Sequence, residues 1–336
     1  MTVTVRPHQY HDRRALSRVL LTATTLVVLS AFIGSTAAVA NVSKWSTPIH
    51  LDPFTTSGGQ TGYSVSCPSA DFCAVADGYG HVIFRRSGQW STPQAVAAGG
   101  SFDSVSCLSA TFCVAMASGE AVTFDGHSWS KKVRAGPDAT YKVSCATTKF
   151  CVAVGASGLP GKPSTIATFN GHAWSSRQTS PSGAFDDRLM DVSCATSKFC
   201  VAVNLDGQIL TFNGTRWVPN RRTGPNGLIS VSCVTKEFCL AVTDSGHSIT
   251  YHGPAWSPSA TIPGFAKAFA YSVSCASTTK CVTVGLSGRA ISWTAGQWSK
   301  PVTIFPGGAV AGVMVACSPS NACVAVNDEG HVSSRA

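Results

Sequence analysis

Residues 192–203 read VSCATSKFCVAV, and shortly after them residues 213–217 read NGTRW. Variants of this combination recur along the chain, each with two cysteines separated by five residues. Successive pairs begin 38 to 49 residues apart, close to the roughly 40 to 45 residues of a four-stranded propeller blade. Seven pairs are present: Cys67 and Cys73, Cys107 and Cys113, Cys145 and Cys151, Cys194 and Cys200, Cys233 and Cys239, Cys275 and Cys281, and Cys317 and Cys323.

Each repeat has room for four short strands separated by turns. In the first repeat, residues 65–67 end the innermost strand, residues 73–76 begin the second, residues 82–84 form the third, and residues 91–96 form the outer strand. The composition agrees, because only 12% of the residues are charged and glycine is abundant, at 31 residues, as suits short strands joined by tight turns. The sequence predicts an all-β, seven-bladed β-propeller with four-stranded blades.

The tryptophans test how the ring closes. Six of the seven repeats carry a tryptophan after the third strand, whereas the seventh ends before one; residues 45–49, WSTPI, hold it instead. An N-terminal strand that completes the last blade pairs the open ends of a ring. We therefore predict this closure, and we expect the tryptophans to pack between strands rather than stack on a ligand. The six are Trp90, Trp129, Trp174, Trp217, Trp256 and Trp298.

The cysteine spacing predicts seven disulfides, each within its own inner hairpin. Directly opposed residues of antiparallel strands lie about 4.5 Å apart at Cα when they are not hydrogen-bonded, which a disulfide can span. Seven metal sites are the alternative, but two thiolates per site leave a zinc ion short of ligands. Disulfides in turn indicate an oxidising compartment outside the cytoplasm.

The first 40 residues differ from the rest. Arg6, Arg13, Arg14 and Arg18 precede an uncharged, mainly apolar run at residues 19–34, and Ala38 and Ala40 are small residues at signal-peptidase positions. We predict a signal peptide over residues 1–40 and a single propeller domain over residues 41–336. The alternative is an uncleaved anchor, which would be the protein's only membrane contact. The expected location is secreted or extracytoplasmic, associated with the cell envelope.

The net charge of the chain limits the classes of partner that we expect it to bind. The formal net charge is +9, and without residues 1–40 it is +6, from 21 basic and 15 acidic residues that are scattered rather than clustered. Such a surface is compatible with anionic envelope polymers and disfavours nucleic acid as a partner. Equivalent histidines, His81, His247 and His331, fall on three separate repeats, too far apart to share an ion unless the central channel is narrow. The sequence therefore predicts a monomer without a metal or other cofactor.

The repeat resembles one found in exported proteins of actinobacteria. The shared pattern is V-S-C, five residues, C-x-A-V and then N-G-x-x-W, as in residues 192–203 and 213–217. The resemblance covers residues 41–336 and implies architecture rather than a function. A weaker likeness is to the Asp-box repeats of sialidases, in residues 123–129, TFDGHSW. Asp boxes form turns and are not catalytic, and only three glutamates are available for a sialidase-like site: Glu120, Glu237 and Glu329.

Candidate ligand-binding residues lie where the repeat is broken. Most repeats have serine three positions before the first cysteine, but Lys142 and Asp191 replace it in the third and fourth repeats, and Asp187 and Arg188 precede the latter. Propeller ligands generally bind at loops that lead into the inner strands, so these four residues suit a polar ligand such as a sugar. The alternative is a solvated loop whose charges pair with one another. An insertion at residues 158–164 lies in the third repeat, the repeat that contains Lys142.

Serine also recurs directly before the first cysteine, in six of the seven repeats. These serines lack a repeated histidine or aspartate partner, so we interpret them as small residues that let neighbouring sheets approach. No catalytic residue is predicted. The leading hypothesis is a non-enzymatic recognition module for a glycan or an extracellular protein. The alternatives are a sialidase-like glycoside hydrolase and a structural scaffold without a small ligand.

Overall fold

The computed structural model describes residues 44–51, 63–96, 100–136, 140–156, 164–175, 178–179, 188–220, 227–265, 269–307 and 312–336. They belong to one compact unit, Ser43–Ala336, and their regular structure is β-strand alone. None of them forms a helix with the length and apolar composition that a membrane crossing needs. The predicted signal peptide, most of the 158–164 insertion and Asp187 lie outside the described residues.

The strands form seven antiparallel sheets. The first three contain β2 (Ser64–Ser69), β3 (Phe72–Ala76), β4 (His81–Arg86), β5 (Gln89–Trp90) and β6 (Gln94–Ala95); β7 (Ser104–Ser109), β8 (Phe112–Ala117), β9 (Glu120–Phe124) and β10 (Val133–Arg134); and β11 (Thr140–Thr147), β12 (Phe150–Gly155), β13 (Thr165–Phe169) and β14 (Gln178–Thr179). The fourth and fifth contain β15 (Leu189–Thr196), β16 (Phe199–Asn204), β17 (Ile209–Phe212) and β18 (Trp217–Pro219); and β19 (Leu228–Thr235), β20 (Phe238–Thr243), β21 (His247–His252), β22 (Ala255–Trp256) and β23 (Ala260–Thr261).

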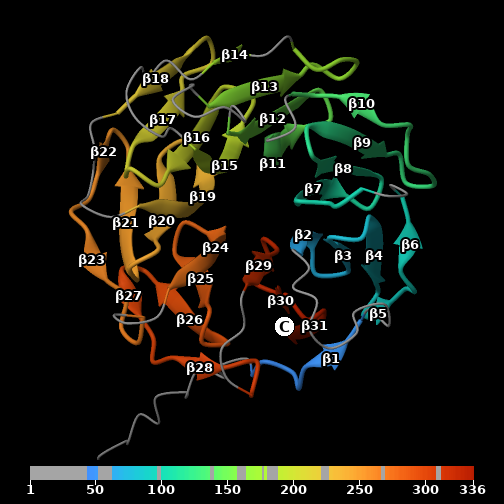
Figure 1. Ribbon diagram of the computed structural model, residues 1–336. Helices are drawn as coiled ribbons and strands as arrows, with labels where there is room; N and C mark the ends of the chain where they lie inside the picture. Colours follow the sequence, from blue (N-terminus) through green and yellow to red (C-terminus); the bar gives the residue numbers. More distant parts are fainter. Residues whose placement is uncertain are drawn as a thin grey trace, which may run out of the picture. The chain divides into compact units, whose positions relative to one another are not determined.

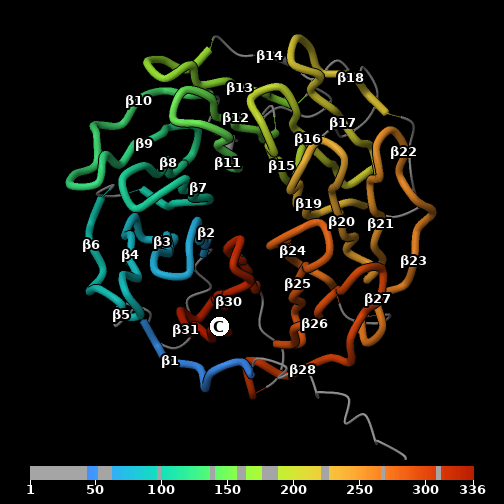
Figure 2. Tube along the Cα trace, turned by 180° about the vertical axis from the view of Figure 1, so that it is seen from behind, coloured from blue at the N-terminus to red at the C-terminus, as the bar shows by residue number. Residues whose placement is uncertain are grey.

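The last two sheets contain β24 (Ala270–Ser277), β25 (Lys280–Gly285), β26 (Arg289–Thr294), β27 (Gln297–Trp298) and β28 (Val302–Thr303); and β29 (Val313–Cys317), β30 (Cys323–Asn327), β31 (His331–Arg335) and β1 (Ile49–His50). The sheets surround a central axis, and the first strand of each is nearest that axis (Figures 1 and 2). The predicted all-β, seven-bladed β-propeller is confirmed. We number its blades one to seven along the chain.

The seven disulfides are where the sequence predicts them. Each joins the inner strand of a blade to the second strand, with Cα–Cα distances of 3.9 to 4.2 Å. In blade three, for example, Cys145 and Cys151 are direct partners in the β11–β12 ladder. No cysteine is free. Every covalent cross-link therefore lies within one hairpin, and none joins two blades.

Alkylation tests this pairing. We expect the unfolded but unreduced chain to take up no iodoacetamide, because all fourteen thiols are oxidised. Proteolytic peptides in mass spectrometry should carry each disulfide within one short loop. Reduction before alkylation is the control and should label every cysteine. Labelling of most cysteines without reduction would contradict the pairing.

The serines directly before the first cysteines join neighbouring blades. The hydroxyl of Ser66 accepts a hydrogen bond from the backbone amide of Cys107, and Ser106 does the same for Cys145 in the next blade. Six blades repeat this contact at 2.9 to 3.0 Å. The sequence-based interpretation as small packing residues was incomplete, because the hydroxyls also satisfy amides on the unpaired edge of the next inner strand.

The serines three positions before the first cysteine form a second set of such bonds. Ser64, Ser104, Ser230 and Ser272 each accept from the backbone amide of a valine in the next blade, at 3.0 to 3.3 Å. We call the two sets together the hydroxyl ring. Blade seven carries Met314 and Ala316 at these positions, which have no hydroxyl, and both pack against the apolar core shared with blade one. At these two positions the contact from blade seven to blade one is therefore apolar.

Each pair of adjacent blades shares one apolar core, and one tryptophan from the repeated position packs against each core; the core between blades five and six also contains Trp293. Trp90 contacts the core between blades seven and one, and Trp45 contacts the core between blades six and seven. The other five occupy equivalent places: Trp129, Trp174, Trp217, Trp256 and Trp298. The tryptophans pack in the blades as predicted, and Trp45 supplies the one that blade seven lacks.

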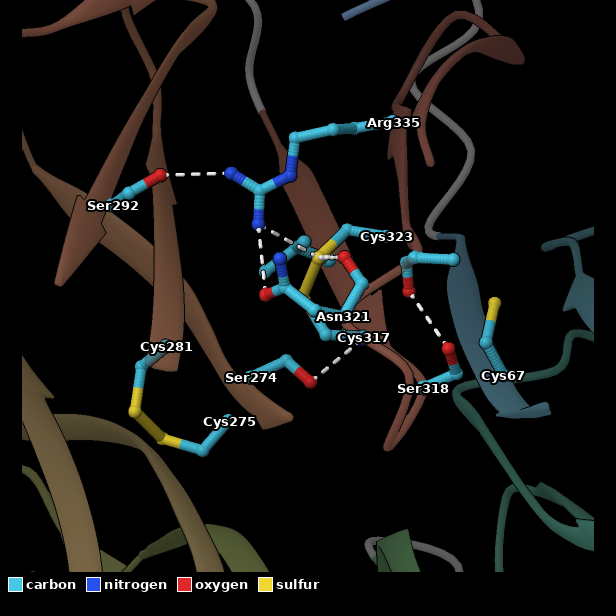
Figure 3. Close-up of a disulfide and its surroundings, with 12 residues drawn as sticks. Cys67, Ser274, Cys275, Cys281, Ser292, Cys317, Ser318, Asn321, Cys323 and Arg335 are labelled. Carbon is cyan, nitrogen blue, oxygen red and sulfur yellow. Dashed lines mark hydrogen bonds between the residues drawn. A yellow bond between two sulfur atoms is a disulfide. The ribbon is translucent and has the colours of Figure 1, made fainter. Parts of the chain in front are cut away.

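The chain closes through β1, which pairs with β31 in blade seven. Ser46 reinforces the closure, since its amide donates to Ser334 O at 2.7 Å and its hydroxyl accepts from the Ser334 amide at 3.0 Å. The predicted ring closure by the N-terminal strand is confirmed. Arg335 adds a contact to the neighbouring blade, because one of its amino groups donates to Ser292 of blade six at 2.8 Å (Figure 3). Its guanidinium also lies 5.5 Å from the centre of the Trp45 ring.

The outer strands differ from the prediction. We expected one strand over residues 91–96, but β5 and β6 are two short strands with residues 91–93 between them. The cause is Ser91, whose hydroxyl accepts from the Phe84 amide at 3.1 Å and donates to Thr92 O at 2.9 Å, replacing one step of the ladder. Serine follows tryptophan in the same way at Ser130, Ser257 and Ser299.

Candidate functional site

The loops that lead into the inner strands and the turns between the second and third strands meet at one end of every blade, which we call the proximal face. The turns between the first and second strands lie on the opposite, distal face. The proximal face is where the predicted ligand-binding residues fall, because Lys142 is near the start of β11, Asp191 is near the start of β15, and Arg188 directly precedes β15. β11 and β15 are adjacent inner strands (Figure 1).

Lys142 breaks the hydroxyl ring. It occupies the position at which other blades place a serine to accept from the next blade, but an ammonium group has no lone pair to accept with. The amide that would need that serine belongs to Val192. It donates instead to Oδ1 of Asp191 in its own blade, at 2.9 Å. Asp191 thus takes over the role that Lys142 cannot perform.

The second carboxylate oxygen of Asp191 makes the contact to the next blade that a serine makes at this position in other blades. Oδ2 accepts from the Val231 amide at 2.9 Å and from the Ser230 hydroxyl at 3.0 Å. The carboxylate therefore holds three donors from two blades. Burial raises the pKa of Asp191, while the charge of Lys142 and these hydrogen bonds act in the opposite direction. Asp191 is thus a structural link between blades four and five.

Two further residues, which the sequence analysis missed, belong to the same part of the proximal face. Asp103 directly precedes β7 in blade two and accepts from the Ser118 amide at 3.2 Å. Tyr141 lies beside Lys142 at a β-bulge in β11, and its hydroxyl is 4.0 Å from the sulfur of Met190. Asp103 and Tyr141 stand one position before the serine site of their blades. Both residues depart from the repeat, but at the position one residue before the serine position that the sequence analysis compared.

Electrostatic interactions tie these groups into one cluster. Burial raises the pKa of Asp103, whereas the Ser118 amide and Lys142 lower it. Burial raises the pKa of Tyr141 as well, with Arg188 lowering it and Asp103 raising it further. Lys142 therefore lies close enough to act on the carboxyls of blades two and four. We call Asp103, Tyr141, Lys142, Arg188 and Asp191 the proximal cluster.

The raised pKa of Asp103 predicts a pH dependence of stability. A carboxyl whose pKa is higher in the folded protein binds more protons when folded, so its contribution to stability is present below its unfolded pKa of about 3.9 and decreases as the pH rises through the folded pKa. We expect Asp103→Asn to remove this contribution. The difference in unfolding free energy between variant and wild type should shift in favour of the variant as the pH rises from about 3.5.

Urea denaturation at a series of pH values measures this difference. The control is Asp125→Asn, because Asp125 is exposed and hydrogen bonds to Ser128 and His127 lower its pKa. That variant should lose stability relative to wild type as the pH rises through the same range. Parallel pH profiles for both variants would contradict the assignment.

The predicted site is thus brought together in part. Lys142, Arg188 and Asp191 share one sector, with Asp103 and Tyr141 added, while Asp187 lies outside the described residues. Elsewhere on the proximal face, four large apolar side chains are exposed: Tyr79, Leu205, Phe269 and Tyr271. The face therefore combines a charged sector with exposed apolar residues.

The three histidines begin the strands β4, β21 and β31 of separate blades, directly after the turns that precede these strands. His81 donates its backbone amide to the Asp77 carboxylate and places its Nδ1 2.9 Å from the other oxygen. His247 contacts Ser245, and His331 lies near Glu329. In the part of the chain that the structure describes, no three His, Cys, Asp or Glu side chains converge as metal ligands. These turns are held by side-chain-to-backbone hydrogen bonds.

No family model matches the sequence, and no curated protein does. Solved structures match the fold. YCF48 bound to D1 peptide aligns over 87% of this chain and 94% of that one, with 13% identity and a TM-score of 0.65. The WD40 β-propeller domain of Doa1 aligns over 88% and 97%, with 11% identity and a TM-score of 0.67. U3-55K aligns over 86% and 98%, with 11% identity and a TM-score of 0.68. At these identities the likeness is one of fold.

Proposed function

We propose that this propeller is a non-enzymatic recognition module that binds a segment of another protein on its proximal face. The observation that carries the proposal is the break in the hydroxyl ring, where Lys142 and Asp191 replace two serines. A repeat that is regular for structural reasons departs from its rule mainly at functional positions. The peptide in the YCF48 structure supports a protein segment as the ligand class.

The disulfides support a place of action outside the cytoplasm. Seven of them in one chain are typical of an oxidising compartment. We place the module outside the cell or at the cell envelope. A protein there has no supply of reductant or ATP, so local covalent support of each hairpin suits it.

The glutamates support recognition over hydrolysis. Glu120 pairs with Lys132 at 3.5 Å, Glu237 with Lys236 at 3.4 Å, and Glu329 lies 3.6 Å from His331. A sialidase-like site needs a glutamate next to a tyrosine nucleophile, yet the proximal cluster contains Tyr141 with aspartates and no glutamate. A glycan remains the other ligand class, with exposed Phe269 and Tyr271 as stacking surfaces.

Selection from a phage library of random linear peptides tests the proposal, with a glycan array run in parallel. Bound peptides should lose affinity for Arg188→Glu, because Arg188 is exposed in the proximal cluster. The matched control is Arg216→Glu, an exposed arginine on the distal face of the same blade, which should bind as wild type does. Equal loss in both variants, or no bound peptide or glycan, would overturn the proposal.

A further inference from the structure

Lys142 differs from the serines at the same position of four other blades. Its side chain is partly buried, and among the described residues no acceptor lies within hydrogen-bond or ion-pair distance of its ammonium group. A serine here would also complete the hydroxyl ring, as it does in four other blades. Lys142 therefore lacks a described hydrogen-bond acceptor, and only the longer-range attraction of Asp103 and Asp191 acts on its charge.

The nearby carboxyls do not fill this role. Asp191 already accepts three hydrogen bonds from Val192, Val231 and Ser230. Asp103 is held by the Ser118 amide. Both feel the charge of Lys142, but neither forms an ion pair with it within 4.0 Å. The acceptors of the cluster are thus occupied, while its ammonium donors are not.

The neighbouring groups extend the set of donors. The hydroxyl of Tyr141 has a thioether sulfur at 4.0 Å as its contact, which is a weak acceptor. The bulge at Tyr141 changes the side-chain alternation of β11, and bulges commonly re-aim side chains next to binding sites. Arg188 adds a positive charge that reaches Tyr141. The cluster therefore offers an ammonium and a phenol, with a guanidinium close by, to a negatively charged acceptor.

We infer that Lys142 and Tyr141 bind a carboxylate of the partner segment, an aspartate or glutamate side chain or a C-terminus, as the anchor of recognition. The inference rests on the proposed function and adds the chemistry that the site selects. A carboxylate supplies the acceptor that these two donors lack. Charge-assisted hydrogen bonds between an ammonium group and a carboxylate are among the strongest in proteins. A peptide that presents the acid can also place apolar side chains against the exposed Phe269 and Tyr271 of the same face.

The test uses the selected phage peptides as fluorescent synthetic probes for fluorescence polarisation. They should be enriched in acidic residues, and Lys142→Gln should weaken their binding at least about tenfold. The matched control is Lys149→Gln, an exposed lysine on the distal turn of the same blade, which should bind within about twofold of wild type. Replacing the acidic residue of a probe by its amide should weaken binding to wild type but not to Lys142→Gln.

The outcomes separate the two claims. Peptides that bind without acidic enrichment and are indifferent to Lys142→Gln would overturn the carboxylate anchor and leave the recognition module standing. Binding of polygalacturonate but of no peptide, lost in Lys142→Gln, would move the anchor to an anionic glycan and overturn the peptide assignment. Absence of any binding would overturn both. Thermal unfolding of Lys142→Gln close to wild type shows that the variant is folded.

Discussion

Asp191→Ala is expected to lower the free energy of unfolding by about 3 kcal/mol, since it leaves three donors of two blades without their acceptor and each unsatisfied buried group costs about 1–3 kcal/mol. Those donors are the amides of Val192 and Val231 and the hydroxyl of Ser230. Urea denaturation measures the loss. A substitution at an exposed polar position should by comparison stay within about 0.5 kcal/mol.

The sharper form of this prediction is a double-mutant cycle with Lys142. Asp191→Ser should keep the bond to the next blade but leave the Val192 amide unsatisfied, a loss of about 1–3 kcal/mol. Lys142→Ser alone should be nearly neutral, because Asp191 still accepts from that amide. The combined variant has a regular hydroxyl ring and should return close to wild-type stability. Additive losses would contradict the exchange of roles between positions 142 and 191.

Trp45→Ala should lower the free energy of unfolding by about 3 kcal/mol, the scale of removing an aromatic side chain from an apolar core. Trp45 packs against the core between blades six and seven and lies under the guanidinium of Arg335. Thermal or urea unfolding measures the loss.

The matched variant is Trp90→Ala, since Trp90 holds the equivalent place in blade one. If the N-terminal segment is part of the last blade in solution, the two variants should lose similar stability. A near-neutral Trp45→Ala beside a destabilised Trp90→Ala would mean that the ring closes without it.

The sequence predicts the ring well because its evidence repeats. Seven cysteine pairs specify the register of seven hairpins, and the displaced Trp45 indicates where the ends meet; the disulfides and the apolar cores between blades follow from local spacing. The hydroxyl ring is harder to predict from the sequence, because Ser66 and Cys107 come into contact only after two blades pack together. The broken ladder after Trp90 depends on one serine side chain competing with the backbone.

The site was predicted only in part for the same reason. Lys142 and Asp191 stand out as departures from the repeat, but their exchange of roles depends on which amide lies nearest in the folded ring. Asp103 and Tyr141 come from two different blades and become neighbours of Lys142 through packing. Sequence spacing indicates the blade and the face on which a residue falls. It does not indicate which side chains of adjacent blades lie close enough to interact.

The placement of the disulfides determines what a protease could do to this molecule. Each bridge closes a loop of a few residues inside one hairpin, from Cys67 and Cys73 in blade one to Cys317 and Cys323 in blade seven. A cut in any segment that connects two blades therefore produces fragments with no covalent bond between them. The fragments would then be held together by packing and hydrogen bonds alone. Digestion would therefore weaken the contacts between blades, while the disulfide within each blade stayed intact.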